Sequence, residues 1–331
     1  MTVPTEDAPA LVRVIWNGSA GAKGGLPTNL SGEADLRAML AEYGLDDDVV
    51  ASDSPDDARA ATRAALAAGA RIVVAAGGDG TTGTVATELL GSETALGILP
   101  LGSVMNIARS LGIPRDLGAA ARVVADGATR AIDIGEVDGE PFFEAGSVGM
   151  NAAMFREANR FDDGDWSSIV RTIWVALRYR PARMTVELDD QTIHTRALMV
   201  VVANGPYTGL GMQVAPLARL DDGRFDVRVF RGFSKWDLIR HLAGIAFGRY
   251  RSTPHVSTFR STRVRITSVR PLPARADARD LGMTPVTFLV RPRALLVVCA
   301  AGPESGADGR ADAVPSTPQQ TSPTNEGNSR A

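Results

Sequence analysis

The sequence is poor in the residues that build disulfides, metal centres and membrane spans. Cys299 is the only cysteine among 331 residues, so no disulfide can form within the chain. The three histidines are scattered, without the spacing of a metal site or of a nucleophilic triad. The most apolar stretches, 197–203 and 294–301, are far shorter than the roughly 20 residues that cross a bilayer. The sequence therefore argues against a disulfide scaffold, a histidine metal centre and a membrane-spanning helix.

A large excess of charge of either sign is also absent, since the formal net charge is −3. The charges are unevenly spread, with nine acidic residues in 31–60 and eleven arginines in 236–300. No nucleic-acid module accompanies the basic region, so we interpret it as attraction to an anionic membrane surface, with a solvated arginine-rich face as the alternative. Residues 1–10 lack the order of a signal peptide. We expect a cytoplasmic protein that reaches the inner membrane surface from that side.

Residues 11–130 alternate between predicted strands and helices. Apolar runs predict strands at 12–16, 49–50, 71–76 and 96–99, and amphipathic spacing predicts helices at 33–43, 56–68, 82–90, 103–111 and 116–125. This alternation predicts an α/β domain built on a doubly wound parallel sheet, with ligands at the carboxyl ends of its strands. We expect residues 1–10 to be a flexible N-terminus.

From residue 131 the pattern changes to short strands separated by turns. Strands are predicted at 131–137, 142–148, 185–188, 197–203, 225–230 and 263–269, with helices at 166–179 and 235–247. We predict a second, mostly antiparallel β domain over 131–300, whose last segment could return to the first domain. Residues 303–331 are polar and without apolar periodicity, which predicts a disordered tail.

Residues 71–81 indicate a buried strand that ends in a glycine turn and leads into a helix. Gly77, Gly78 and Gly80 allow another molecule to approach the backbone, and the helix N-terminus offers N–H groups to phosphate oxygens. Asp79 would repel a polyphosphate unless a hard divalent cation lay between them. The turn therefore predicts a metal-nucleotide site, and an ordinary tight turn is the alternative.

A second segment repeats this plan. Residues 97–109 run from an apolar strand through Gly102 and Ser103 into a helix that contains Asn106. Since the carboxyl ends of neighbouring parallel strands share one edge of the sheet, we expect the two turns to face one cleft.

Together with further turns at 17–21, 147–149 and 221–226, these motifs resemble the diacylglycerol kinase catalytic-domain superfamily, which includes bacterial lipid kinases, sphingosine kinases and ceramide kinases. The resemblance covers roughly residues 11–300. It implies an α/β nucleotide-binding domain like those of nicotinamide-nucleotide kinases and phosphofructokinases, followed by a β-sandwich domain for the lipid acceptor. Nicotinamide-nucleotide kinases share the Gly-Gly-Asp-Gly-Thr turn but lack the segment that residues 100–106 approximate, so that family ranks second.

The resemblance also implies ATP and Mg²⁺ as cofactors and assigns residues to them. The implied nucleotide-binding residues are Asn17, Ser52, Ala76, Gly77, Gly78, Asp79, Gly80, Thr81, Gly102, Ser103 and Asn106. In the β domain, Asp222 with the backbone carbonyls of Arg219 and Arg224 would hold a structural or regulatory magnesium ion. A plain hairpin turn at 221–223 is the alternative.

The catalytic base is where the sequence departs from the family. The late Asp-Gly-Glu motif of the family matches Asp277-Ala278-Arg279, and an arginine cannot accept a proton. We therefore predict Asp277 as the base and Asp79 as the second catalytic residue. Family residues are also replaced at Gly83-Thr84, Ile107 and Asn151.

The sequence thus predicts an ATP-dependent lipid kinase that phosphorylates a hydroxyl of diacylglycerol, a sphingoid base or a related lipid. Its expected partners are ATP and a lipid acceptor at a membrane surface, with no nucleic acid, and a homodimer stays open. The lost carboxylates keep a second class open, a diverged and weakly active or inactive member that binds nucleotide or lipid. A nicotinamide-nucleotide kinase is the third alternative.

Overall fold

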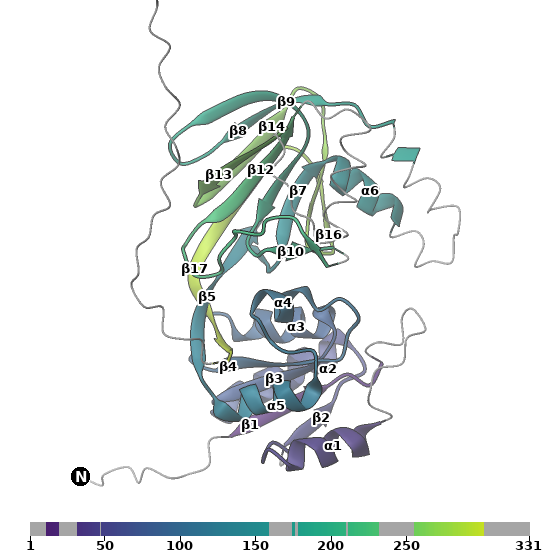
Figure 1. The fold of residues 1–331 in the computed structure, drawn as a ribbon, viewed down its shortest axis with the longest axis vertical. Coiled ribbons are helices and arrows are strands. Elements are labelled where there is room, and N and C mark those ends of the chain that lie inside the picture. The colour runs from purple at the N-terminus through teal and green to yellow at the C-terminus, as the bar shows by residue number, and fades with distance from the viewer. Residues whose placement is uncertain are drawn as a thin grey trace, which may run out of the picture. The chain divides into compact units, whose positions relative to one another are not determined.

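The structure is a computed structural model that describes residues 11–19, 32–46, 48–158, 174–175, 178–209, 211–231 and 255–300 (Figure 1). Four sequence predictions fall wholly or mostly outside these residues: the helices at 166–179 and 235–247 and the terminal segments at 1–10 and 303–331.

The first half of the chain builds a parallel sheet with helices packed on it (Figure 1). Its elements are β1 (Val12–Trp16), α1 (Glu33–Ala41), β2 (Val49–Ala51), α2 (Pro55–Ala67), β3 (Ile72–Gly77), α3 (Asp79–Leu89), β4 (Ala95–Pro100), α4 (Asn106–Ser110) and α5 (Leu117–Asp126). The strand order is β4-β3-β1-β2, and each neighbouring pair runs parallel. Every residue of β3 and β4 is buried, as expected for strands covered on both faces. The predicted doubly wound sheet is confirmed.

Two helices begin three residues away from their predicted starts, and both differences lie at the glycine turns. The helix predicted at 82–90 begins at Asp79, because Gly78 takes an extended backbone (φ −88°, ψ −175°) and serves as its N-cap. Asp79, Gly80 and Thr81 therefore form the first turn of α3. The helix predicted at 103–111 spans only Asn106–Ser110, after Met105 in the left-handed conformation (φ 55°).

The second half is β-rich and mostly antiparallel. Its elements are β5 (Thr129–Val137), β6 (Glu140–Phe142), β7 (Ala145–Gly149), α6 (Met150–Ala158), β8 (Ala182–Glu187), β9 (Thr192–Ala203), β10 (Tyr207–Thr208), β11 (Met212–Gln213), β12 (Phe225–Arg231), β13 (Val256–Ser261), β14 (Arg263–Ser268), β15 (Pro273–Ala276), β16 (Arg279–Met283) and β17 (Val286–Val298). The strand predicted at 142–148 is in fact two strands, β6 and β7, separated at Phe143 and Glu144.

One long strand links the two halves into a single sheet. β17 pairs antiparallel with β14 and β5, and near its end Val297 pairs parallel with Leu96 of β4. The second half has its own core, in which the ring of Phe142 stacks on Phe225 (5.6 Å between centroids) and meets Phe288 edge-on (5.8 Å). The division of the chain near residue 130 stays a prediction. Among the described residues, no helix is both long and apolar enough to cross a membrane.

Candidate active site

The carboxyl ends of the parallel strands bring four loops to one edge of the sheet. The Asn17 N–H donates to the Ala76 carbonyl (2.9 Å), and the Ser52 N–H donates to the Trp16 carbonyl (2.8 Å). The register Trp16↔Ala76 in β1–β3 and Gly77↔Pro100 in β3–β4 places the two glycine turns side by side.

The two glycine turns are in direct contact. A Cβ added at Gly102 would lie 2.8 Å from the Gly78 Cα, closer than real Cβ atoms come. Only glycine fits at position 102, because the two backbones approach too closely for a side chain. The guanidinium of Arg115 supports the second turn by donating to the carbonyls of Ser103 (2.8 Å) and Gly102 (3.1 Å).

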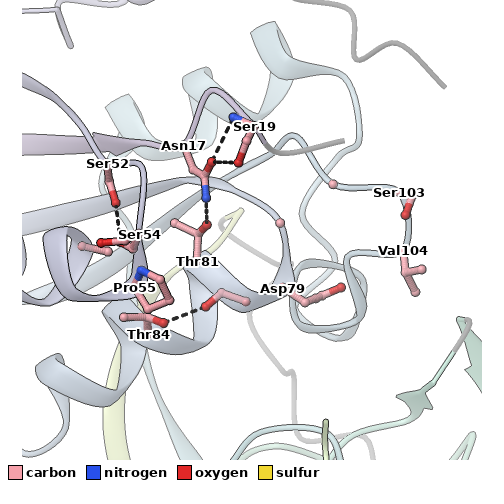
Figure 2. Close-up of a pocket in the computed structure, with 14 residues that line it drawn as sticks. Asn17, Ser19, Ser52, Ser54, Pro55, Asp79, Thr81, Thr84, Ser103 and Val104 are labelled. Atoms are coloured by element: carbon pink, nitrogen blue, oxygen red, sulfur yellow. Dashed lines mark hydrogen bonds between the residues drawn. The ribbon is translucent and has the colours of Figure 1, made fainter. Parts of the chain in front are cut away.

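A pocket of about 370 Å³ opens where these loops meet (Figure 2). Eight of the predicted nucleotide residues line it, namely Asn17, Ser52, Gly78, Asp79, Gly80, Thr81, Gly102 and Ser103. Figure 2 shows the Asn17 amide donating to the Thr81 hydroxyl (3.2 Å), so the loop after β1 is tied to the first turn of α3. The first N–H groups of a helix have no intrahelical partner, so this turn presents unpaired donors and a positive dipole end.

The start of α2 adds pocket residues that sequence reasoning missed. Ser54 and Pro55 line the pocket, and the Ser54 hydroxyl caps α2 by accepting the Asp57 N–H (3.2 Å). The signal was available, because in a doubly wound sheet every helix after a strand begins at the ligand-binding edge.

Three predicted nucleotide residues lie elsewhere. Ala76 and Gly77 are buried within β3 and do not line the pocket. The Asn106 side chain is also buried, and its Nδ2 donates to Glu144 Oε2 (3.0 Å) and to the Gly209 carbonyl (2.8 Å). Asn106 therefore connects α4 to the second half of the chain.

A second cleft of about 630 Å³ lies beside the pocket and is lined from both halves of the chain. Its walls include Ile107, Pro141 and Phe143 as apolar surface. Asp79 and Gly80 line both the pocket and the cleft. The two spaces therefore meet at the first turn of α3.

Asp79 is the carboxylate at this junction. Its Oδ1 accepts the Ile107 N–H at 3.4 Å, so it faces the second glycine turn. Burial raises the pKa of Asp79, while the backbone N–H groups of Ile107, Met105 and Asn106 act in the opposite direction.

Asp277 lies in the cleft, in the turn of the β15–β16 hairpin, with a left-handed backbone (φ 46°). Both oxygens of its carboxylate accept backbone N–H groups: Oδ2 from Phe143 (2.7 Å), and Oδ1 from Glu144 (2.9 Å) and Ala145 (3.1 Å). Burial raises the pKa of this carboxyl, against the lowering effect of these donors and of Arg275. Asp277 thus holds the 143–145 backbone in place.

Glu144 is a cleft residue that the sequence analysis missed. Its Oε2 accepts Asn106 Nδ2 (3.0 Å) and the Gly209 N–H (3.2 Å). Burial, with the nearby carboxylates of Asp277 and Asp79, raises the pKa of Glu144 to about 8. The available signal was a lone acidic residue inside the apolar run 142–148, because such a residue needs a partner or a function.

Most of the departures from the family gather at this cleft. Gly83, Thr84, Ile107 and Arg279 all line it, and Arg279 forms an ion pair with Glu140 (3.4 Å). Asn151 is not among the residues that line the cleft, and its Oδ1 accepts a hydrogen bond from Arg275 Nη1 (3.3 Å).

Asp222, which the resemblance assigns to a magnesium ion in the β domain, faces an arginine side chain. Arg260 Nη1 lies 3.4 Å from Asp222 Oδ2, and its Nη2 lies 3.8 Å from Asp226. The Arg219 side chain is paired with Asp221 (3.0 Å), and the Arg224 N–H donates to Asp222 Oδ1 (3.1 Å). A divalent cation at Asp222 would sit against a guanidinium. Within the part of the chain that the structure describes, no group of three or more acidic, histidine or cysteine side chains could hold a metal.

Comparisons with known proteins follow the two halves of the fold. The family model described as diacylglycerol kinase catalytic domain matches residues 12–137, and the one described as YegS C-terminal NAD kinase beta sandwich-like domain matches residues 145–299. The chain is 30% identical over 253 residues to a protein of Chromohalobacter salexigens named "probable lipid kinase YegS-like", covering 74% of this chain and 80% of that one. It is 28% identical over 247 residues to the diacylglycerol kinase of Bacillus subtilis, covering 72% and 82%.

Solved structures show the same fold. The crystal structure of a diacylglycerol kinase from Bacillus anthracis superposes with a TM-score of 0.65, over 88% of this chain and 97% of that one, at 18% identity. This likeness covers both halves, including the β-rich half that the sequence analysis predicts.

Proposed function

Because this chain belongs to the diacylglycerol kinase catalytic-domain family of lipid kinases, we propose that it transfers the γ-phosphoryl group of ATP to the hydroxyl of a lipid. The observation that carries this proposal is the junction at α3. The pocket and the cleft share Asp79, so a nucleotide in one space would meet an acceptor in the other beside that carboxylate.

The pocket suits the phosphates of a nucleotide. The first turn of α3 supplies unpaired N–H groups, and at Gly80 the space where a side chain would stand is open, so another molecule can approach the backbone there. Asp79 alone would oppose a polyanion, but its hard oxygens suit Mg²⁺, and the residues present therefore fit a magnesium nucleotide. When bound, Mg²⁺ would neutralise charge that develops on the phosphoryl oxygens.

The cleft suits the acceptor. Ile107, Pro141 and Phe143 give it apolar walls for part of a lipid, and its lining also includes the carboxylates beside which a hydroxyl would meet the nucleotide. For the lipid itself we propose only that it carries a hydroxyl group, as diacylglycerol and sphingoid bases do.

We also propose that the acceptor is met at an anionic membrane surface, on the cytoplasmic side where ATP is available. One end of the β8–β9 hairpin is basic, with Arg183 opposite Arg196 in the register. Beside it Arg270 donates to the Arg180 carbonyl (3.1 Å), and Val269 is 84% exposed. Arginines around an exposed apolar side chain favour an anionic bilayer.

A nucleotide- or lipid-binding protein without catalysis is the second candidate function. The observation that favours it is Arg279, which takes the position of a family carboxylate and pairs with Glu140 in the cleft. Incubation with labelled ATP and a mixture of diacylglycerol, ceramide and sphingoid bases separates the two. Labelled lipid supports the kinase, whereas retained ATP binding without product supports the binding protein.

The variant Asp79→Asn tests the role of the junction. We expect labelled lipid to fall at least 100-fold with an unchanged circular dichroism spectrum, since this carboxylate serves the metal nucleotide rather than the core. Glu88→Ala is the matched control on α3, because Glu88 forms only an ion pair with Arg63 (2.7 Å) away from the pocket. Activity of Asp79→Asn near that of the control would refute the proposed site.

A further inference from the structure

The proposed reaction needs a group that accepts the proton of the lipid hydroxyl, and the structure narrows the choice. Four carboxylates line the described part of the cleft: Asp79, Glu140, Glu144 and Asp277. The four carboxylates differ in the groups that their oxygens already contact.

Asp277 is poorly placed to act as the base. Its two oxygens accept backbone N–H groups from Phe143, Glu144 and Ala145 at 2.7 to 3.1 Å. These bonds stabilise the ionised form and occupy the lone pairs that a proton would need. Protonation would also leave three backbone donors with a weaker acceptor.

Asp79 and Glu140 are committed to other contacts. Asp79 also lines the pocket proposed for the nucleotide, where its charge would be matched by the metal ion. The Glu140 side chain is 65% exposed and forms an ion pair with Arg279 (3.4 Å), so its carboxylate already has a partner.

Glu144 has one oxygen held and one oxygen available. Asn106 from α4 and the Gly209 N–H fix Oε2, and among the described residues no donor reaches Oε1. The Glu144 N–H is held by Asp277, so both its backbone and its side chain are fixed. The structure thus orients one free carboxylate oxygen in a cleft where the acceptor would lie.

We infer that Glu144 is the catalytic base for the acceptor hydroxyl, with Asp277 as the residue that positions it. This inference rests on the proposed kinase function. As the acceptor oxygen forms a bond to the γ-phosphorus, the bond from that phosphorus to the β–γ bridging oxygen breaks and its electron pair leaves with ADP. The acceptor proton moves to Glu144, which later releases it to water.

The surroundings of Glu144 give it suitable basicity. Burial raises the pKa of Glu144 most, and Asp277 and Asp79 raise it further, while Asn106 and the Gly209 N–H lower it. Arg275 lies near enough to interact. The resulting pKa of about 8 is close to the neutral range in which a base works best, whereas an exposed glutamate near 4.3 would be a weak one.

Glu144→Gln is the test, because it keeps the shape and the hydrogen bonds to Oε2 but cannot accept a proton. We expect kcat for labelled lipid to fall at least 100-fold, while the ATP affinity measured by calorimetry changes less than 2-fold. Glu144→Asp should recover part of the rate. Glu136→Gln is the control, since Glu136 on β5 pairs with Arg291 (3.4 Å) and does not line the cleft.

The outcomes separate this inference from the proposed function. A Glu144→Gln protein with kcat within 3-fold of wild type overturns the role of Glu144 and leaves the kinase intact. A base must lose its proton before it acts, so kcat should rise with pH. Loss of that rise in Asp277→Asn but not in Glu144→Gln would assign the base to Asp277. A wild-type protein that binds ATP but makes no labelled lipid overturns both the kinase and its base.

Discussion

Replacing Arg260 by glutamine should destabilise the β-rich half by a measurable and pH-dependent amount. Arg260 lies 3.4 Å from Asp222 and 3.8 Å from Asp226, whose side chains are 19% and 6% exposed. Loss of one partner from a buried ion pair costs about 3–5 kcal/mol, whereas an exposed pair contributes about 0–1 kcal/mol. Because the Arg260 side chain is itself 45% exposed, we expect a loss of about 2 kcal/mol at pH 7.

The Asp226 carboxyl determines how the stability loss in Arg260→Gln changes with pH. Burial raises the pKa of Asp226, and Arg260 is the largest influence that lowers it, followed by Arg228. Removing Arg260 raises the folded-state pKa further. A carboxyl whose folded pKa lies above the unfolded value of about 3.9 costs no stability below that unfolded value, and the cost grows as the pH rises from there through the folded pKa. The loss in Arg260→Gln should therefore shrink as the pH falls from 7 towards 4.

Urea unfolding at pH 7 and pH 4.5 measures both quantities. Arg265→Gln is a matched control, because its side chain is equally exposed (46%) but its partner Glu187 is 41% exposed and 3.9 Å away. We expect that control to lose less than about 0.5 kcal/mol. An equal loss in both variants, or a loss that does not change with pH, would refute the reasoning.

The same variant tests whether Arg260 keeps a divalent cation away from Asp222. Without the guanidinium, Asp222 and Asp226 form a carboxylate pair that millimolar Ca²⁺ or Mg²⁺ should stabilise, whereas wild type without nucleotide should not respond at this site. If cations stabilise the wild type and Asp222→Asn abolishes that response, then a cation binds at Asp222 beside Arg260, and the sequence prediction for that residue stands.

Two further variants test the geometry of the site. Gly102→Ala should destabilise the protein by about 1–3 kcal/mol and weaken ATP binding, because its Cβ would lie 2.8 Å from the Gly78 Cα. The control Gly80→Ala should not lower stability, because its Cβ would have nothing within 4 Å. Urea unfolding compares the two variants. Asp277→Asn should lower both kcat and the urea midpoint, because the amide accepts N–H groups less well than the carboxylate that now receives three of them. A variant with normal stability and a 100-fold lower kcat would instead favour Asp277 as the base.

The fold of the first half could be predicted because each element there carries a local signal. Buried parallel strands such as β3 are continuous apolar runs, and the glycine turns mark where they end. The start of α3 was missed because Asp79, Gly80 and Thr81 have low helix propensity. Their helical conformation follows from the tertiary position of the turn against Gly102, which no local pattern encodes.

The cleft was harder to predict, because its residues come together through pairings between distant strands. Asp277 reaches the 143–145 backbone across more than 130 positions, and it does so only because β15 pairs with β7. The sequence identified Asp277 from its motif, but it could not show that backbone donors fill its lone pairs. It likewise could not show that the break between β6 and β7 turns Glu144 into the cleft, since the run 142–148 resembles one strand.

The position of Glu144 affects what the replacement of a family glutamate by Arg279 means for catalysis. An arginine in the cleft removes one carboxylate, yet Arg279 is paired with Glu140 and adds no unbalanced positive charge. The burial and the neighbouring carboxylates of Asp277 and Asp79, which raise the pKa of Glu144 to about 8, are therefore retained. Loss of the motif glutamate thus argues against catalysis only if no other carboxylate can reach the acceptor. Glu144 is fixed from both halves of the chain, and no described residue donates a hydrogen bond to its Oε1. It therefore satisfies that condition in the proposed reaction, and this favours the kinase over the binding protein.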